Sequence, residues 1–338
     1  MTIQTSVDQW QRPLHDLRIS VTDRCNFRCS YCMPKEIYGS SFRFMTREEL
    51  LSFEEIYRLS CLFVSLGVKK VRITGGEPLL RPNVEELIMR LKAIDGIKDM
   101  GLTTNGVLLK NKAKELYDAG LRRLNISLDA LDSELFGRLN GRGFDSKIIV
   151  ENINYAQDMG FKIKVNMVVQ KGQNDEEVGP MADYFKRQGI ELRYIEFMDV
   201  GNDNEWSYDK VISQEEILKQ LQMKNELIPS TQEYYGEVAK RYKYKDSEAE
   251  VGFISSVSKP FCSSCTRGRL SSNGKFYNCL FASEGVDLQR LLRNGSTDEE
   301  IIHVIRSAWE QRNDRYSAER TEQSVNKRKK ISMCYIGG

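Results

Sequence analysis

The feature of this sequence that most constrains its fold is a serial alternation of short β-rich runs and helical runs over the first two-thirds of the chain. The six candidate strands occupy residues 17–22, 71–75, 100–105, 123–129, 161–169 and 191–198. A capping-box pattern from Thr46 to Glu49 predicts the start of one intervening helix, and Gly120 and Gly160 supply stops for two others. Strands that alternate with helices form parallel sheets with right-handed crossovers. A doubly wound sheet and a TIM-like barrel both satisfy this pattern, and both gather functional residues at the carboxyl ends of the strands.

The rhythm changes from about Gln220. Residues 233–281 alternate short β-like runs with glycine turns, among them a hairpin signal from Ser272 to Lys275. Two helices are predicted to follow, one near 286–293 and one capped by Thr297. We therefore expect a barrel-like domain over 1–220 and a smaller α+β domain over 221–338.

Composition excludes several classes of protein. The 338 residues carry a net charge of only +2, which gives no long-range field for nucleic acid. No apolar stretch approaches the ~20 residues that span a bilayer, and the N-terminus lacks a secretory pattern. A cytoplasmic protein is expected, in which clustered cysteines indicate metal or redox sites rather than disulfides.

The first cysteine cluster lies in DRCNFRCSYCM, directly after the first candidate strand. Cys25, Cys29 and Cys32 are spaced C-x3-C-x2-C. A structural zinc site needs four ligands, whereas a four-iron cluster held by three thiolates keeps one iron open for another molecule. The second interpretation is favoured, and a zinc site with a remote fourth ligand is the alternative.

A glycine-rich turn, GGEP at residues 75–78, follows the second candidate strand. Gly75 and Gly76 permit a close backbone approach to a bound molecule. Glu77 is either a second acceptor for that molecule or a brace for the turn. An ordinary strand–helix turn explains the glycines alone, but not their place beside the cysteine loop.

The second cysteine cluster comprises Cys262, Cys265 and Cys279, again three ligands where a zinc ribbon would supply four. Arg267 and Arg269 alternate on a candidate strand, so their side chains share one side. Guanidinium groups there suit a nucleobase edge or a phosphate, although arginine pairs are also common on exposed ribbons. Of the other two cysteines, Cys61 is expected in the core, and Cys334 has no sequence neighbour that makes it a site.

Basic residues on the candidate strands predict an anion site. Lys162, Lys164 and Asn166 share one face of their strand, and a polar face turned into a barrel is costly without a ligand. A solvated edge face is the alternative.

The cysteine spacing, Tyr31 before the last cysteine and the GGEP turn together resemble the radical S-adenosylmethionine (SAM) superfamily. The second cluster, written CxxCxRxRL, and the terminal Gly337–Gly338 pair resemble, within it, the GTP 3',8-cyclases of molybdenum cofactor biosynthesis. This resemblance implies an α/β fold, an incomplete (βα)6 TIM-like barrel with a C-terminal α+β domain over its open side. It also implies SAM and two [4Fe-4S] clusters, each with three cysteine ligands.

The resemblance also implies the site residues. Charge at the strand ends adds Lys70 and Arg193 as further phosphate candidates. The metal ligands are Cys25, Cys29, Cys32, Cys262, Cys265 and Cys279. SAM contacts are Tyr31, Gly76, Ser127 and Met198. GTP contacts are Arg18, Lys70, Arg72, Thr103, Lys164, Arg193, Arg267, Gly268 and Arg269. Catalytic roles are assigned to Arg267, Arg269, Gly337 and Gly338.

The chemistry implied is a 5'-deoxyadenosyl radical that abstracts the ribose 3' hydrogen of GTP, after which the C3' radical adds to guanine C8 and yields 3',8-cyclo-7,8-dihydro-GTP. The implied partners are an electron donor and cyclic pyranopterin monophosphate synthase, with no nucleic acid and no membrane, and a homodimer is left open. The alternatives are a radical SAM enzyme that modifies peptides and a zinc-stabilised nucleotide-binding protein without catalysis.

Overall fold

The computed structural model of the protein describes residues 5–201 and 204–337, and in these ranges it has one sheet of 12 strands. The strands are β1 (Asp16–Ser20), β2 (Lys70–Thr74), β3 (Asp99–Thr104), β4 (Arg123–Ser127), β5 (Lys162–Val169), β6 (Glu191–Glu196), β7 (Leu227–Pro229), β8 (Lys240–Tyr244), β9 (Glu250–Ile254), β10 (Arg267–Leu270), β11 (Lys275–Tyr277) and β12 (Val286–Asp287). Their order is β12-β11-β10-β1-β2-β3-β4-β5-β6-β9-β8-β7. Each of the six predicted strands is present, with its bounds shifted by one or two residues.

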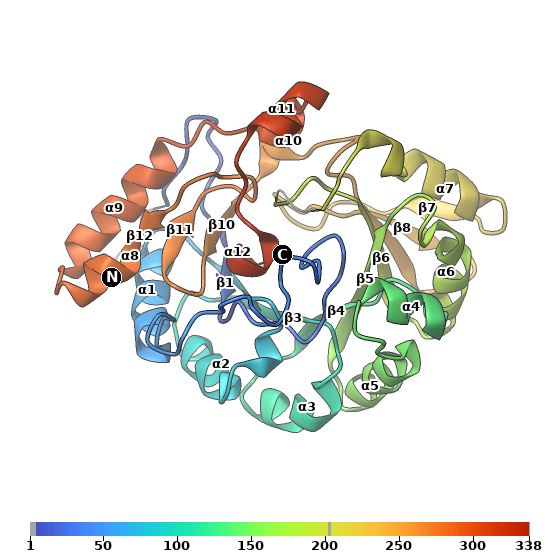
Figure 1. Ribbon diagram of the computed structural model, residues 1–338, viewed down its shortest axis with the longest axis horizontal. Coiled ribbons are helices and arrows are strands. Elements are labelled where there is room, and N and C mark those ends of the chain that lie inside the picture. Colours follow the sequence, from blue (N-terminus) through green and yellow to red (C-terminus); the bar gives the residue numbers. More distant parts are fainter. Residues whose placement is uncertain (1–4, 202–203, 338) are drawn as a thin grey trace.

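The sheet curves into a partial barrel with helices around its outside (Figure 1). The helices are α1 (Phe53–Ser65), α2 (Val84–Lys92), α3 (Leu109–Asp118), α4 (Ser133–Leu139), α5 (Ser146–Asp158), α6 (Val178–Arg187), α7 (Gln214–Gln222), α8 (Leu288–Arg293), α9 (Asp298–Glu310), α10 (Tyr316–Glu319), α11 (Glu322–Lys327) and α12 (Met333–Ile336). The strands β1 to β6 are parallel to one another, as the alternation of strands and helices predicts. The expected α/β barrel architecture is confirmed.

The C-terminal third of the chain extends this sheet at both of its edges. β10 pairs in parallel with β1, and β9 pairs in parallel with β6. The hairpin partners β11 and β8 then run antiparallel to them. Strands from both sides of residue 220 thus share one sheet, and the division into domains 1–220 and 221–338 stays a prediction.

One predicted helix start is wrong. The capping box at Thr46 does not open α1, which begins at Phe53 with Ser52 as its N-cap. The Ser52 hydroxyl accepts from the Glu55 N–H at 3.1 Å, and the Glu55 carboxylate accepts from the Ser52 N–H at 2.7 Å. At Thr46 the backbone N–H reaches Glu49, at 2.7 Å, and the segment forms only a turn. The complete, reciprocal box is the one that nucleates the helix.

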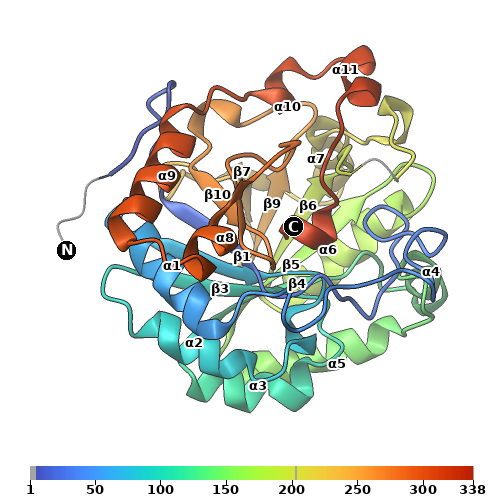
Figure 2. The same ribbon diagram turned by 60° about the vertical axis from the view of Figure 1, so that its left-hand side comes forward.

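The C-terminal end of the chain enters the middle of the barrel. α12 lies inside the ring of strands in both views and packs against β1 (Figures 1 and 2). Ile336 is fully buried there. The last described residues therefore reach the edge of the sheet where the loops after the strands converge.

Candidate functional site

The cysteine loop and the glycine turn meet at the carboxyl edge of β1 and β2. The Gly76 N–H donates to the Thr22 carbonyl at 2.8 Å, and the Glu77 N–H donates to the Arg24 carbonyl at 2.8 Å. A Cβ on Gly76 would lie 2.3 Å from the Arg24 carbonyl oxygen. Glycine is required here because the two backbones touch.

A buried arginine holds the loop in shape. The Arg28 guanidinium donates to the carbonyls of Tyr38 (2.7 Å), Cys25 (2.8 Å) and Phe27 (2.6 Å). These contacts fold the chain around a side chain that the sequence pattern did not mark. The thiols that they position are unpaired by disulfides.

Burial dominates the electrostatics of the first cysteine cluster. It raises the pKa of the Cys25 thiol to about 12, and it raises the pKa values of Cys29 and Cys32 well above their usual range. The thiols are thus neutral in the metal-free chain, and only a bound cationic group would make them thiolates. Three soft, half-buried sulfurs without disulfide partners on one short loop fit an iron–sulfur cluster.

No convergent site for a single metal ion is found among the described residues. Within that part of the chain no three thiol, carboxylate or imidazole groups approach one point. A four-iron cluster is larger than one ion, so its thiolates stand around it rather than at one point.

The Glu77 side chain braces the turn. Its Oε1 accepts from the Leu79 N–H (3.0 Å) and the Thr104 hydroxyl (2.7 Å), and its Oε2 accepts from the Asn105 N–H (2.7 Å). These contacts join the turn after β2 to the end of β3. Of the two roles left open by the sequence, the brace is the one these contacts support.

The four expected SAM contacts lie on loops or strand ends at the same edge. Tyr31 donates to Asp129, the second residue after β4, at 2.8 Å. Ser127 ends β4, Gly76 follows β2 and Met198 follows β6. Their assignment to SAM stays a prediction.

The basic residues of the barrel form a row across neighbouring strands. Arg18 on β1 is in register with Arg72 on β2 and with Arg269 on β10. Burial, followed by repulsion from Arg269, Arg72 and Arg267, holds the pKa of Arg18 well below its usual range. Over residues 5–201 and 204–337, no carboxylate lies within ion-pair distance of these four guanidinium groups. Four clustered guanidinium groups without an ion-pair partner are suited to bind an anion.

The remaining basic candidates are partly neutralised. Lys164 lies 2.6 Å from Glu191, and Arg193 lies 2.5 Å from the same carboxylate. Lys70 lies 3.6 Å from Asp99 and donates to the Tyr234 hydroxyl at 2.9 Å. Lys162 is exposed, so the face predicted to hold it together with Lys164 is only partly turned inward. Thr103 lies beside Asn125, which in turn pairs with Lys164 across β4 and β5.

The second cysteine set brackets the strand that carries the arginines. Cys262 and Cys265 lie on a short turn directly before β10, and Cys279 follows β11. Although burial opposes it, the charges of Arg267 and Arg312 lower the pKa of Cys265 to about 6, whereas burial raises that of Cys279 to about 12. The three sulfurs of Cys262, Cys265 and Cys279 fit a second cluster as a donor set.

Gly268, which separates the two arginines in sequence, packs tightly against Phe276 and Leu14. A Cβ there would lie 2.8 Å from the Phe276 ring and 3.0 Å from Leu14. In this chain the aromatic ring fills the space beside residue 268, so the strand is not loosened.

The C-terminal tail brings two further groups to the site. Arg269 donates to the Gly337 carbonyl, and Gly338 lies outside the described residues. Cys334 is buried with Met33 and Tyr38, and Cys25 and Cys32 pack against this group. These neighbours of Cys334 could not be predicted from the sequence, because all of them lie 296 or more residues away along the chain.

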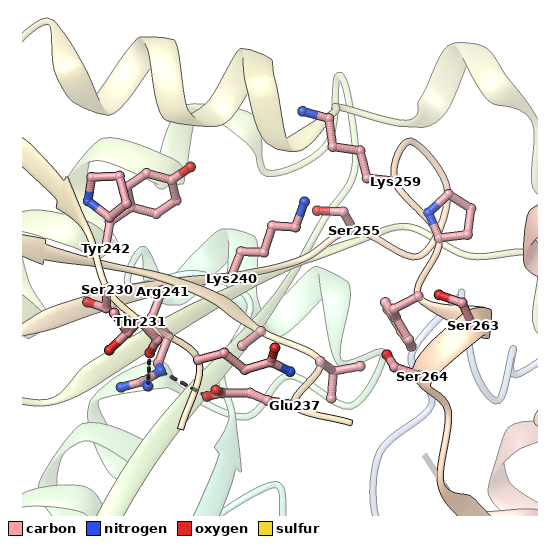
Figure 3. Close-up of a pocket in the computed structure, with 16 residues that line it drawn as sticks. Ser230, Thr231, Glu237, Lys240, Arg241, Tyr242, Ser255, Lys259, Ser263 and Ser264 are labelled. Atoms are coloured by element: carbon pink, nitrogen blue, oxygen red, sulfur yellow. Dashed lines mark hydrogen bonds and ion pairs between the residues drawn. The ribbon is translucent and has the colours of Figure 1, made fainter. Parts of the chain in front are cut away.

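A cavity of about 520 Å³ lies outside this arrangement, against the turn that carries Cys262. Figure 3 shows its polar lining, with Arg241 held by Glu237. Arg241 is also paired with Glu250 at 2.7 Å, so its charge is already balanced. None of the expected site residues lines this cavity.

The described helices include none that is both long and apolar enough to cross a bilayer.

Comparisons with known proteins agree with this geometry. Residues 19–185 match the family model described as Radical SAM superfamily, and residues 190–318 match the one described as Molybdenum Cofactor Synthesis C. A GTP 3',8-cyclase of Staphylococcus epidermidis is 56% identical over 334 residues, which is 98% of each chain. One of Staphylococcus saprophyticus is 53% identical over 339 residues, which is 99% of this chain and 100% of that one.

Among solved structures, the fold is similar to that of Streptococcus suis SuiB bound to S-adenosylmethionine. The TM-score is 0.59 at 17% identity, over 88% of this chain and 69% of that one. Another structure of SuiB gives a TM-score of 0.60 over 93% and 70% of the two chains.

Proposed function

The chain belongs to the family of GTP 3',8-cyclases, and we propose that it converts GTP to 3',8-cyclo-7,8-dihydro-GTP in molybdenum cofactor biosynthesis. It is a radical SAM enzyme. The single observation of its own structure that supports the substrate is the row of Arg269, Arg18 and Arg72, with Arg267 beside it. A triphosphate and a guanine edge are the kind of acceptor-rich anion that such a row selects.

The first cluster would be held by Cys25, Cys29 and Cys32, with SAM on its open iron. When bound, they supply the 5'-deoxyadenosyl radical that takes the ribose 3' hydrogen. The proposed SAM contacts around it are Tyr31, Gly76, Ser127 and Met198. The brace at Glu77 keeps the turn rigid while the molecule binds.

The second cluster is proposed on Cys262, Cys265 and Cys279. It would lie beside Arg267 and Arg269, the proposed catalytic arginines, so guanine could be held between metal and guanidinium groups. The proposed triphosphate contacts are Arg18, Lys70, Arg72, Lys164 and Arg193, with Thr103 and Gly268 nearby. Gly337 and Gly338 are proposed to close the site, supported by the contact between Arg269 and Gly337.

The remaining assignments are also proposals. They are the division into domains 1–220 and 221–338, a cytoplasmic location, an external electron donor, and cyclic pyranopterin monophosphate synthase as the enzyme that takes the product. A homodimer is left open.

The test is anaerobic turnover. Protein reconstituted with iron and sulfide is given SAM and dithionite with GTP, with ATP or without nucleotide, and 5'-deoxyadenosine and the nucleotide product are quantified. The proposal predicts release stimulated by GTP alone, with a product of the mass of GTP and altered chromatographic behaviour. Release that is indifferent to nucleotide would favour a peptide substrate, and no release from fully loaded protein would contradict radical SAM activity.

A further inference from the structure

A buried group of charged side chains lies behind the second cysteine turn. Asp8 and Arg12, from the segment before β1, have side chains with no exposed surface, and Arg312 follows α9. The Asp8 Oδ2 accepts from Arg12 Nε at 2.6 Å and from Arg312 Nη1 at 3.3 Å. One carboxylate is thus shared by two guanidinium groups, which leaves one buried positive charge uncompensated within this group.

The two arginines each hold one cysteine of the C-x2-C pair. Arg12 Nη1 donates to the Cys262 carbonyl at 2.7 Å, and Arg312 Nη1 donates to the Cys265 carbonyl at 2.8 Å. The positive charge of Arg312 helps to lower the pKa of the Cys265 thiol. The N-terminal segment and the segment after α9 therefore clasp the turn from 262 to 265, and neither belongs to the cysteine motif.

The arginines are themselves fixed. The Trp309 indole N–H donates to the Arg12 carbonyl at 3.0 Å, and the Arg312 guanidinium lies 4.5 Å from the centre of the Trp309 ring. Arg312 Nε is buried and has no hydrogen-bond partner among the described residues. A buried donor without an acceptor destabilises the fold, and an unpaired buried charge destabilises it further. An anionic group beside Cys265 would offset both effects.

We infer that Arg12 and Arg312, bridged by Asp8, are positioning residues for the second iron–sulfur cluster, and that Arg312 also raises its reduction potential. The inference rests on the proposed second cluster. Fixing the two carbonyls fixes the direction in which the Cys262 and Cys265 sulfurs point. Hydrogen bonds to cluster sulfurs and a nearby positive charge favour the more negative, reduced state, which raises the potential.

The clasp differs from the support of the first cysteine loop. There one arginine, Arg28, holds the Cys25 carbonyl from within the motif itself. At the second turn the holding groups come from residues 250 and 47 positions away in sequence. The second cluster is therefore predicted to depend on the docking of both chain segments, whereas the first depends on its own loop.

The experiment uses the full-length chain with Cys25, Cys29 and Cys32 replaced by Ser, so that only the second cluster contributes signals. In this background we compare Arg12→Gln, Arg312→Gln and Arg312→Lys, with Arg58→Gln as a control for a half-exposed arginine paired with Asp298 at 2.7 Å. The measurements are iron and sulfide per chain, the rate of iron loss to a chelator, and the potential from an electron paramagnetic resonance titration.

The parent should hold about four irons per chain. Arg12→Gln should lose iron to the chelator about 10–100-fold faster, as is typical when support of a metal ligand is removed. Arg312→Gln should have a lower potential than the parent, Arg312→Lys should recover part of that shift because it keeps the charge, and Arg58→Gln should match the parent in both readouts.

Each of the other possible outcomes contradicts a specific part of the inference. Unchanged iron loss in Arg12→Gln and unchanged potential in Arg312→Gln would refute the role of the arginines while the second cluster stands. A parent without iron would remove the second cluster, and the inference with it, while GTP-dependent turnover by the unmodified chain would still test the proposed function separately. Should Arg312→Gln not fold, Arg312→Lys decides: a potential and a rate of iron loss equal to the parent's, in a variant that lacks the guanidinium contacts to Asp8 and the Cys265 carbonyl, would refute the positioning role of Arg312.

Discussion

Arg269 on β10 donates a hydrogen bond to the carbonyl of Gly337, 68 residues further along the chain. The same tail residue lies against Thr74, the last residue of β2, so the tail touches two strands that flank β1. The contact links a proposed catalytic arginine with the terminal segment inside the barrel. It makes the conformation of Gly337 a testable element of the site.

The first prediction concerns that conformation. Gly337 has a φ of 75°, and a Cβ there would lie 2.3 Å from Thr74 Cγ2. Gly337→Ala should displace the tail and reduce turnover by about 100-fold, because small misplacements of reacting groups cost that much. The midpoint of thermal unfolding should change little, since the affected segment is terminal.

The matched control for this prediction is Gly295→Ala. Gly295 has a φ of 79° but no atom within 4 Å of its added Cβ, so it carries the backbone strain without the steric conflict. It should keep normal turnover. Equal turnover in both variants would show that the tail position does not matter for catalysis.

The second prediction tests the close approach at the glycine turn. A Cβ on Gly76 would lie 2.3 Å from the backbone oxygen of Arg24, which cannot move without moving the cysteine loop. Gly76→Ala should destabilise the fold by ~1–3 kcal/mol and lower the iron bound by the first cluster. Denaturant unfolding and iron analysis of the reconstituted protein measure the two effects.

Gly101→Ala provides the comparison on the neighbouring strand. Its nearest atom would be 3.5 Å away, an ordinary contact. If Gly101→Ala lost as much iron as Gly76→Ala, the loss would be a general effect of replacing glycine by alanine. That result would contradict the steric explanation.

The third prediction is a pH dependence. Burial raises the pKa of Glu77 to about 7, even though three donors contact its carboxylate. A carboxyl with a folded-state pKa above its unfolded value of about 4.5 binds its proton more tightly when folded. Its contribution therefore favours the folded state at low pH and is lost as pH rises from about 4.5 to about 7.

Glu77→Gln cannot ionise, so its free energy of unfolding should fall less over this window than that of the parent, by at most about 3 kcal/mol. Urea unfolding at pH 5, 6, 7 and 8 measures the difference. Exposed Glu134→Gln, paired with Arg138 at 3.2 Å, should retain the parent's dependence. Parallel curves for parent and Glu77→Gln would contradict the prediction.

Local rules account for most of the fold. The strand–helix alternation, the Ser272–Lys275 hairpin between β10 and β11, and the Thr297 cap of α9 are all present where periodicity and turn chemistry predict them. The pairing of β9 with β6 and of β10 with β1 was not predictable in the same way. Parallel partners far apart in sequence leave no local signal, because their register is set by tertiary packing.

The same reasoning separates the site residues. The cysteines, the GGEP turn and the place of Arg18 and Arg72 on neighbouring strands follow from motif and strand position, whereas the register that aligns the two arginines is a finding of the structure. Asp8, Arg12, Arg312 and Cys334 belong to no motif and reach the site only through tertiary contacts. In the sequence, Asp8 and Arg12 are only charged residues in a segment without a motif. That pattern alone does not predict that they are buried beside the second cysteine turn.

The fourth prediction concerns the anchor of the C-terminal segment. Asp199, almost fully buried just after Met198, forms ion pairs with Arg320 (2.8 Å) and Lys330 (2.8 Å) and accepts from the Tyr316 hydroxyl. Asp199→Asn removes a buried carboxylate that pairs with both Arg320 and Lys330. This should destabilise the fold by ~3–5 kcal/mol if the segment stays docked, or release the segment if it does not.

Hydrogen exchange distinguishes local release from global loss. In Asp199→Asn, amides of 316–336 should exchange faster than in the parent, while those of β2 and β3 keep their protection. Turnover should fall with the tail's release, because the Gly337 contact with Arg269 depends on the same segment. Asp298→Asn, which breaks a half-exposed pair with Arg58, should cost only about 0–1 kcal/mol and leave exchange in the tail unchanged. Unchanged exchange over 316–336 in Asp199→Asn would show that apolar packing of Tyr316 and Ile336, rather than this carboxylate, holds the tail in the barrel.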